Sequence, residues 1–142
     1  QTYIKNVLAN AKILAETLKN NGFKIYSGGT DTHLMLVDLR PFNVKGNVAA
    51  ESLCRANITC NKNGIPFDTE KPMITSGIRL GSQAATTRGF GLKEFEKVGE
   101  LITKVIKGLS ENPEDNSKVE NEVKDEVVNL CSNFPIYKNL SK

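Results

Sequence analysis

Residues 75–91 read TSGIRLGSQAATTRGFG and lie where a strand is expected to give way to helix. The apolar segment ITSGIRL at 74–80 predicts an extended strand. The small residues of SQAATTRGFG at 82–91 then predict one short turn of helix, which ends at Gly89. A long amphipathic helix is expected over 92–109, because apolar residues recur there at spacings of three and four.

Arg79 is the residue in this stretch that needs a chemical explanation. It stands between Ile78 and Leu80, with Gly77 and Gly81 on either side. Glycines let the backbone approach another group closely, and burying a guanidinium among apolar residues costs free energy unless an anion meets it. A ligand carboxylate would accept two parallel hydrogen bonds from it. An internal Asp or Glu would serve as well, and the residues alone leave both readings open.

The remainder of the chain predicts short strands enclosed by helices. The expected elements are helices at 2–20, from Asn47 through Cys54 and from Ser117 through Leu130, and strands at 23–27, 33–39 and 57–60. Asn47 is a plausible N-cap, and Ser117 with Glu120 has the spacing of a capping box. The left-handed preference of Asn21-Gly22 should end the first helix. This order predicts the α/β or α+β class, with a small, mostly antiparallel sheet.

Length and composition fit one domain. The chain has 142 residues, of which 39% are hydrophobic and 25% charged, as in ordinary globular proteins. No apolar run approaches the roughly 20 residues that cross a bilayer, so a membrane is not an expected partner. The three cysteines form no CxxC pair and there is one histidine, so no metal site is expected. A chain that begins with Gln1 is expected to be a piece of a longer protein.

The charge is unevenly distributed. Residues 1–110 carry 15 Lys and Arg against 9 Asp and Glu, whereas residues 111–142 carry 4 against 7. A mildly basic body attracts anionic small molecules or nucleic acid. However, the lysines are spread singly along helices without interleaved aromatic residues, which favours solvated helix faces over nucleic-acid binding.

The segment NKNGIPFD at 61–68 offers two amide side chains around Lys62. Amides present donors and acceptors that suit a planar heterocycle with several ring nitrogens. Composition alone favours a surface turn, since Asn and Gly are common in turns. No nucleophile–base pair is apparent either, and Asp31 and His33, which flank Thr32, are not expected to form a catalytic dyad. No catalytic residue is therefore assigned to this chain.

Four stretches together carry a family resemblance. They are SGGTDTHLMLVDLR at 27–40, RANITCNKNGIPFD at 55–68, TSGIRLGSQAATTRGFG at 75–91 and NFPIY at 133–137. In this order and spacing the chain resembles the C-terminal small domain of serine hydroxymethyltransferase. The resemblance implies that residues 1–142 are this one domain of a fold-type I pyridoxal-phosphate transferase, with a short, mostly antiparallel sheet covered by helices.

The resemblance implies an activity for the parent protein, meaning the longer chain to which this segment belongs. Such an enzyme interconverts serine plus tetrahydrofolate with glycine plus 5,10-methylenetetrahydrofolate. Pyridoxal 5'-phosphate is its cofactor and tetrahydrofolate its co-substrate. The expected partners are the large domain of the same chain and a second copy in a cytoplasmic homodimer.

The resemblance also implies roles for particular residues. Arg79 matches the family arginine that binds the carboxylate of the amino-acid substrate. Asn63 matches a residue that hydrogen-bonds the pterin ring of folate. Lys71, Pro72 and Met73 lie where the family also contacts folate, with Met73 in place of the usual phenylalanine.

The family's cofactor-binding residues have no counterpart here. The Thr-rich segment with the Schiff-base lysine, the ring-stacking histidine and the pyridinium-pairing aspartate belong to the large domain. We therefore expect the isolated chain to be inactive. Two alternatives are the small domain of another fold-type I pyridoxal-phosphate enzyme, and a freestanding module that binds a ligand or a protein.

Overall fold

One antiparallel sheet organises the part of the chain that the computed structural model describes, which comprises residues 2–27, 34–58, 60–65, 68–71, 74–81, 91–112 and 114–132. Its strand order is β1-β2-β4-β3. The strands are β1 (Lys24–Ser27), β2 (Leu34–Asp38), β3 (Asn61–Asn63) and β4 (Gly77–Gly81). The helices are α1 (Thr2–Asn20), α2 (Gly46–Arg55), α4 (Leu92–Glu111) and α5 (Ser117–Ser132). The expected fold class is confirmed.

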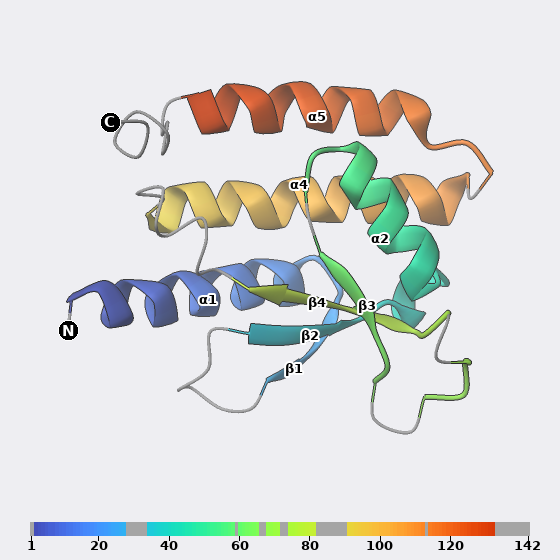
Figure 1. Cartoon of the computed structure of the whole chain (residues 1–142), viewed down its shortest axis with the longest axis horizontal. Helices are drawn as coiled ribbons and strands as arrows, with labels where there is room; N and C mark the ends of the chain where they lie inside the picture. The colour runs from blue at the N-terminus through green and yellow to red at the C-terminus, as the bar shows by residue number, and fades with distance from the viewer. Residues whose placement is uncertain are drawn as a thin grey trace, which may run out of the picture.

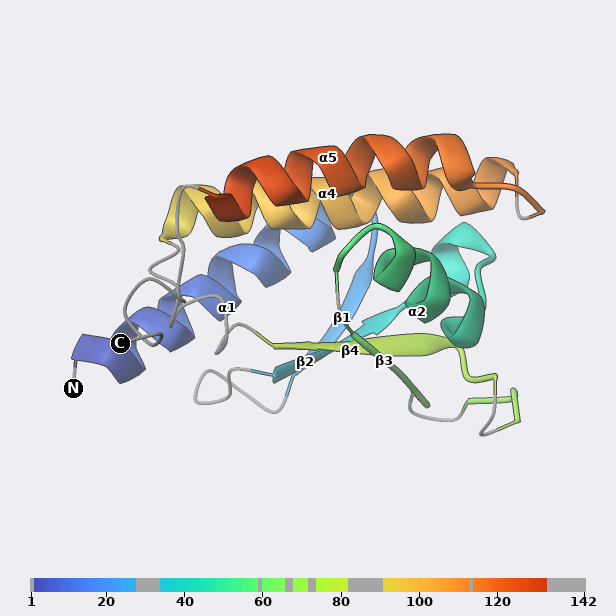
Figure 2. The ribbon, with the colours of Figure 1, turned by 45° about the horizontal axis from the view of Figure 1, so that its top comes forward.

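The helices lie on one side of the sheet (Figures 1 and 2). α1, α2 and α4 cover the sheet, and α5 packs outside them on α4 and α2. None of the described helices has both the length and the apolar character needed to cross a membrane. We call the opposite side of the sheet, turned away from these helices, the outer face.

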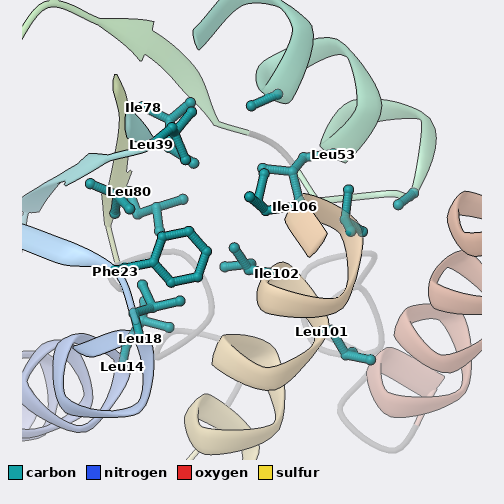
Figure 3. Packing of buried hydrophobic residues seen from close by; sticks show 14 of the residues in the cluster. Leu14, Leu18, Phe23, Leu39, Leu53, Ile78, Leu80, Leu101, Ile102 and Ile106 are labelled. Carbon is teal, nitrogen blue, oxygen red and sulfur yellow. The ribbon is translucent and has the colours of Figure 1, made fainter. Parts of the chain in front are cut away.

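The apolar core fills the space between the sheet and the helices (Figure 3). Phe23 lies between Leu18 of α1 and Ile102 of α4, and all three side chains are buried. The expected apolar stripe of α4 is therefore confirmed over most of its length. Leu92 is the exception, since its side chain is 53% exposed at the start of the helix.

The first helix ends as the sequence predicts. Gly22 has a φ of 103°, in the left-handed region, and the Phe23 amide donates to the Leu18 carbonyl at 3.0 Å. This bond satisfies one of the carbonyls that a helix end leaves without an internal donor. It also turns the chain directly into β1.

The start of α2 differs from the expectation that Asn47 is its cap. The N-cap residue is Lys45, and Asn47 lies inside the first turn. The amides of Gly46 and Asn47 donate to the carbonyls of Thr75 and Ile74, at 3.0 and 2.9 Å. Because the backbone just before β4 satisfies these two amides, the helix begins without a capping side chain.

The strand expected at 57–60 is also wrong. Asn57 adopts a left-handed φ of 73°, and the Ile58 amide donates back to Leu53 at 2.8 Å. These residues therefore close the end of α2, and the strand begins only at Asn61. The side chain of Ile58 packs on the core, which explains its apolar character.

β4 begins later than the expected strand at 74–80. The amides of Ile74 and Thr75 both donate to the Lys71 carbonyl at 2.9 Å, and Thr75 has a φ of 58°. The segment is thus a turn until Gly77. The short helix expected at 82–91 falls mainly on residues outside the described ranges, as do the residues 28–33 and the closing NFPIY.

The last helix begins at Ser117 as predicted, but the capping box is wrong. Instead of turning back to the helix start, the Glu120 carboxylate accepts hydrogen bonds from Arg55 Nε and Nη2, both at 2.9 Å, and from Ser52 Oγ. Asn116 Nδ2 donates to Ser52 Oγ at 3.1 Å and to the Val105 carbonyl at 3.0 Å. A buried polar cluster therefore joins α2, α4 and α5.

From this cluster we predict that the free energy of unfolding depends on pH. The Arg55 guanidinium lowers the pKa of Glu120 below its ordinary value, although burial opposes the shift. The ionised Glu120 contributes its full share of the free energy of unfolding above about pH 4.3, the pKa of glutamate in an unfolded chain. This contribution is lost as the pH falls through the lowered pKa of Glu120 in the folded chain. Glu120→Gln should lower the free energy of unfolding by about 2 kcal/mol at pH 7. In urea denaturation the difference should shrink in acid.

Glu126→Gln is the matched control. Glu126 also lies on α5 and pairs with Lys97 of α4 at 2.9 Å, but both side chains are more than a third exposed. Such a pair contributes about 0.5 kcal/mol. A pH-independent loss on Glu120→Gln would contradict the assigned role of the Arg55 pair.

Candidate functional site on the outer face

The register of the sheet places the two principal candidates on one face. Arg79 of β4 lies opposite Leu36 of β2 and Asn61 of β3. Because directly opposed residues project to the same side, Asn61 and Arg79 share a face, and so does Asn63 two residues along β3. Asn63 and Arg79 are diagonal neighbours, for which the typical spacing is roughly 7–8 Å.

Arg79 projects from the outer face, and its side chain is exposed. Ile78 and Leu80, its neighbours in sequence, are 0% and 5% exposed and belong to the core on the helix side. The expectation of an apolar setting around the guanidinium is therefore wrong for the described chain. The alternation of a β-strand separates the apolar neighbours from the charge.

The alternative of a structural arginine finds no support in the described ranges. No carboxylate there lies within ion-pair distance of Arg79. Asp38, on the neighbouring strand β2, is bound to Arg40, and Glu70, the described acidic residue nearest to Arg79 in sequence, is bound to Lys45. The guanidinium is consequently available to an anion from outside this part of the chain.

Asn63 is half-buried at the end of β3, and its Nδ2 donates to the Gly64 carbonyl at 2.9 Å. The following loop lies against the sheet beside it. A Cβ on Gly77, the residue opposite Asn63, would lie 2.7 Å from the Ile65 side chain, so glycine is required for this close approach. The expectation that glycine permits a close approach here is confirmed at Gly77.

The other folate candidates are on the loop between β3 and β4. Lys71 is exposed, and its carbonyl forms the turn that precedes β4. Pro72 and Met73 lie outside the described residues. Arg79 and Asn63 therefore lie on neighbouring strands, and Lys71 lies in the loop that connects these two strands.

A second charged group borders the same region and was not predicted from the sequence. Asp38 is 1% exposed, and it accepts hydrogen bonds from Arg40 Nε at 3.1 Å and Nη2 at 2.8 Å. The hydrogen bond to Asp38 raises the pKa of Arg40. On β1, the strand next to β2, the Lys24 ammonium lies 5.2 Å from the ring centre of Tyr26. The sequence signal for this ion pair was the position of Asp38 and Arg40, two residues apart.

Asp68 is the other residue that sequence reasoning missed. Its carboxylate accepts the Glu70 amide at 2.8 Å, the i to i+2 bond that aspartate commonly forms in turns. An aspartate after IPF in a loop was therefore a recognisable turn signal. What it could not show is that the same carboxylate also reaches Ser76.

The described residues do not fit a Schiff-base or metal site. A lysine that forms a Schiff base is activated by desolvation or by a neighbouring cation. Every lysine whose side chain is described is exposed. The described His, Cys, Asp and Glu side chains form no group of three or more that would hold a metal ion. What this face offers chemically is an exposed guanidinium on Arg79 and the amide side chains of β3, which are groups able to form hydrogen bonds with a ligand.

Comparison with known proteins identifies the family of this chain. The model of the serine hydroxymethyltransferase family matches residues 1–102. The chain is 88% identical over 138 residues to the serine hydroxymethyltransferase of Pelagibacter ubique, which covers 97% of the chain and 32% of that relative. It is 65% identical to the Marinomonas enzyme over 96% of the chain, again 32% of the relative. The chain thus spans about a third of the length of these curated relatives. It belongs to the serine hydroxymethyltransferase family.

Proposed function

We propose that this chain is the C-terminal small domain of a serine hydroxymethyltransferase and that it supplies two binding residues to the active site of the parent protein. The observation that carries the proposal is the placement of Arg79 and Asn63 as diagonal neighbours on the outer face. Two substrates that meet at this face would find a cation for the carboxylate of one and an amide for the heterocycle of the other.

Arg79 binds the carboxylate of serine or glycine. A guanidinium presents two parallel N–H donors in the geometry of a carboxylate, and the charge makes each bond stronger than a neutral one. The outer face is exposed in the described chain, so the parent protein must exclude water from this pair by covering it. Coverage would raise the strength of the interaction, because charges attract more strongly in a medium of low dielectric constant.

Asn63 binds the pterin ring of tetrahydrofolate, and the loop with Lys71, Pro72 and Met73 contributes further contacts. An amide side chain combines a carbonyl acceptor with two N–H donors, which matches the donor and acceptor edge of a pterin. The half-buried position of Asn63 at the end of β3 fixes its backbone, so the amide is already held where it would be used.

The cofactor is held by the rest of the parent protein. Pyridoxal phosphate supplies an electron sink for the bond changes at the amino acid. The exposed lysines of the described chain do not suit its attachment. We therefore assign binding of the amino acid and of folate to this chain, and the reaction itself to the parent, a cytoplasmic homodimer.

The function is tested by comparing the parent protein with the isolated chain. With pyridoxal phosphate present, the parent should convert serine to glycine only when tetrahydrofolate is supplied. The isolated chain should show no conversion, because it lacks the other half of the site. Both reactions are followed by glycine release.

Two results would contradict the proposal. Conversion of serine by the parent at an equal rate without tetrahydrofolate would favour another pyridoxal-phosphate enzyme of this fold. Saturable micromolar binding of serine or tetrahydrofolate to the isolated chain, measured by calorimetry, would favour a freestanding binding module.

A further inference from the structure

The loop of residues 64–76 joins the strand that carries Asn63 to the strand that carries Arg79. Its shape therefore affects both the folate contacts and their distance from Arg79. Loops of this length normally depend on fixed internal hydrogen bonds if they are to hold one conformation. Among the described residues of this loop, four hydrogen bonds converge on a single carboxylate.

Asp68 accepts four hydrogen bonds. Its Oδ2 accepts the Ile65 amide at 3.2 Å and the Ser76 amide at 2.8 Å. Its Oδ1 accepts the Glu70 amide and the Ser76 hydroxyl, both at 2.8 Å. Ile65 follows β3 and Ser76 directly precedes β4, so one side chain ties together the two ends of the loop.

The carboxylate stays ionised in this position. Partial burial of Asp68 opposes ionisation, but the hydrogen bonds from Glu70, Ser76 and Ile65 outweigh it and lower the pKa of Asp68 to about 2. A charged acceptor forms stronger bonds with amide donors than a neutral one. All four donors are therefore held throughout the pH range in which an enzyme would be assayed.

A second set of contacts fixes the far side of the loop. The carbonyls of Ile74 and Thr75 accept the first amides of α2, and the Lys71 carbonyl accepts the amides of both residues. Lys45, just before α2, forms an ion pair with Glu70. Lys71, Ile74 and Thr75 are thus held between α2 and the Asp68 carboxylate.

We propose that Asp68 is a positioning residue for the folate co-substrate, because it fixes the loop that bears the folate contacts relative to Asn63 and Arg79. The inference rests on the proposed function and adds to it a residue that does not itself contact the ligand. Asparagine at this position is nearly the same size as aspartate. It presents one acceptor oxygen and an NH₂ group, which faces donors instead of accepting from them.

The test uses the full-length parent enzyme with the substitution Asp68→Asn. The KM for tetrahydrofolate should rise about tenfold, which corresponds to the loss of about one net hydrogen bond, while the KM for serine and the absorbance of the bound cofactor stay the same. Ser76→Ala removes one of the four donors and leaves the charge, so it should raise the same KM by a smaller factor.

Asp115→Asn is the matched control. Asp115 also accepts an amide and a hydroxyl, both from Ser117, at 3.1 and 2.7 Å, but it lies in the connection before α5. It should leave both KM values unchanged. If Asp68→Asn does not accumulate as a folded enzyme, Ser76→Ala decides the question alone.

Asn63→Ala in the same assay separates the two proposals. A raised folate KM for Asn63→Ala together with normal values for Asp68→Asn and Ser76→Ala would overturn the inference and leave the proposed function intact. Normal folate kinetics in all three would overturn the folate site itself. An equal rise of both KM values with a lowered melting temperature would mean that Asp68 serves only the fold.

Discussion

Arg79→Ala in the parent enzyme should weaken serine binding by about 2–4 kcal/mol, which is roughly 30- to 700-fold. The loss is large because two charge-assisted hydrogen bonds disappear and the substrate carboxylate is left without its counter-charge. Before serine is added, the absorbance of the bound cofactor should equal that of the unsubstituted enzyme. Equilibrium titration with serine, followed through that absorbance, measures both quantities.

Folding should be unaffected by the same substitution. Arg79 is exposed on the outer face and has no ion-pair partner among the described residues, so its removal leaves no buried group unpaired. Surface changes of this kind alter the free energy of unfolding by less than about 0.5 kcal/mol. Arg79→Lys should recover only part of the serine affinity, because an ammonium cannot form the paired contact.

Lys62→Ala is the control for simple loss of charge. Lys62 is exposed on β3, next to Asn61, but lies opposite Ile78 and therefore projects to the other side of the sheet. Serine affinity should stay within a factor of two. If Lys62→Ala weakened serine binding as much as Arg79→Ala, the effect would be one of overall charge and the carboxylate contact would be wrong.

Gly46→Ala should lower the free energy of unfolding of the chain by about 3 kcal/mol. A Cβ at Gly46 would lie 2.0 Å from Thr75 Oγ1 and 2.5 Å from the Gly77 carbonyl oxygen. α2 cannot easily move away from these atoms, because the Gly46 amide donates a hydrogen bond to the Thr75 carbonyl at 3.0 Å. The added methyl group must therefore displace backbone on both sides.

Thermal unfolding measures this effect. A loss of about 3 kcal/mol corresponds to a fall in melting temperature of about 10 °C for a chain of this size. Gly64→Ala is the control, since the nearest atom to its Cβ would be an Asp68 oxygen at 3.7 Å, an ordinary contact. Equal melting temperatures for the two variants would show that α2 and the residues before β4 are less tightly packed than described.

The spacing of apolar residues was sufficient to predict an element wherever that spacing alone decides which side chains face the core. α1 and α4 were predicted from apolar residues at helical spacing, and apart from Leu92 the ones whose side chains are described pack in the core beneath the sheet. The end of α1 followed from Asn21-Gly22, because a left-handed residue is a local requirement. In such elements the sequence neighbours are also the structural neighbours.

The errors share one physical cause, which is a partner distant in sequence. Asn47 does not cap α2, because carbonyls about thirty residues later satisfy the first amides. Glu120 does not complete a capping box, because Arg55 and Ser52 bind its carboxylate from another helix. A capping pattern describes only what a side chain can do locally, and a stronger remote partner takes precedence.

By itself, the sequence determined the class of fold, the identity of the candidate ligand-binding residues through their family pattern, and the boundaries of the long helices. Only the tertiary structure decided that Arg79 stands in the open rather than among its apolar neighbours, that Asn63 lies diagonally beside it, and that Asp68 ties the intervening loop. The reason is that strand register and loop closure bring together residues far apart along the chain. No local pattern of side chains records which of them will meet.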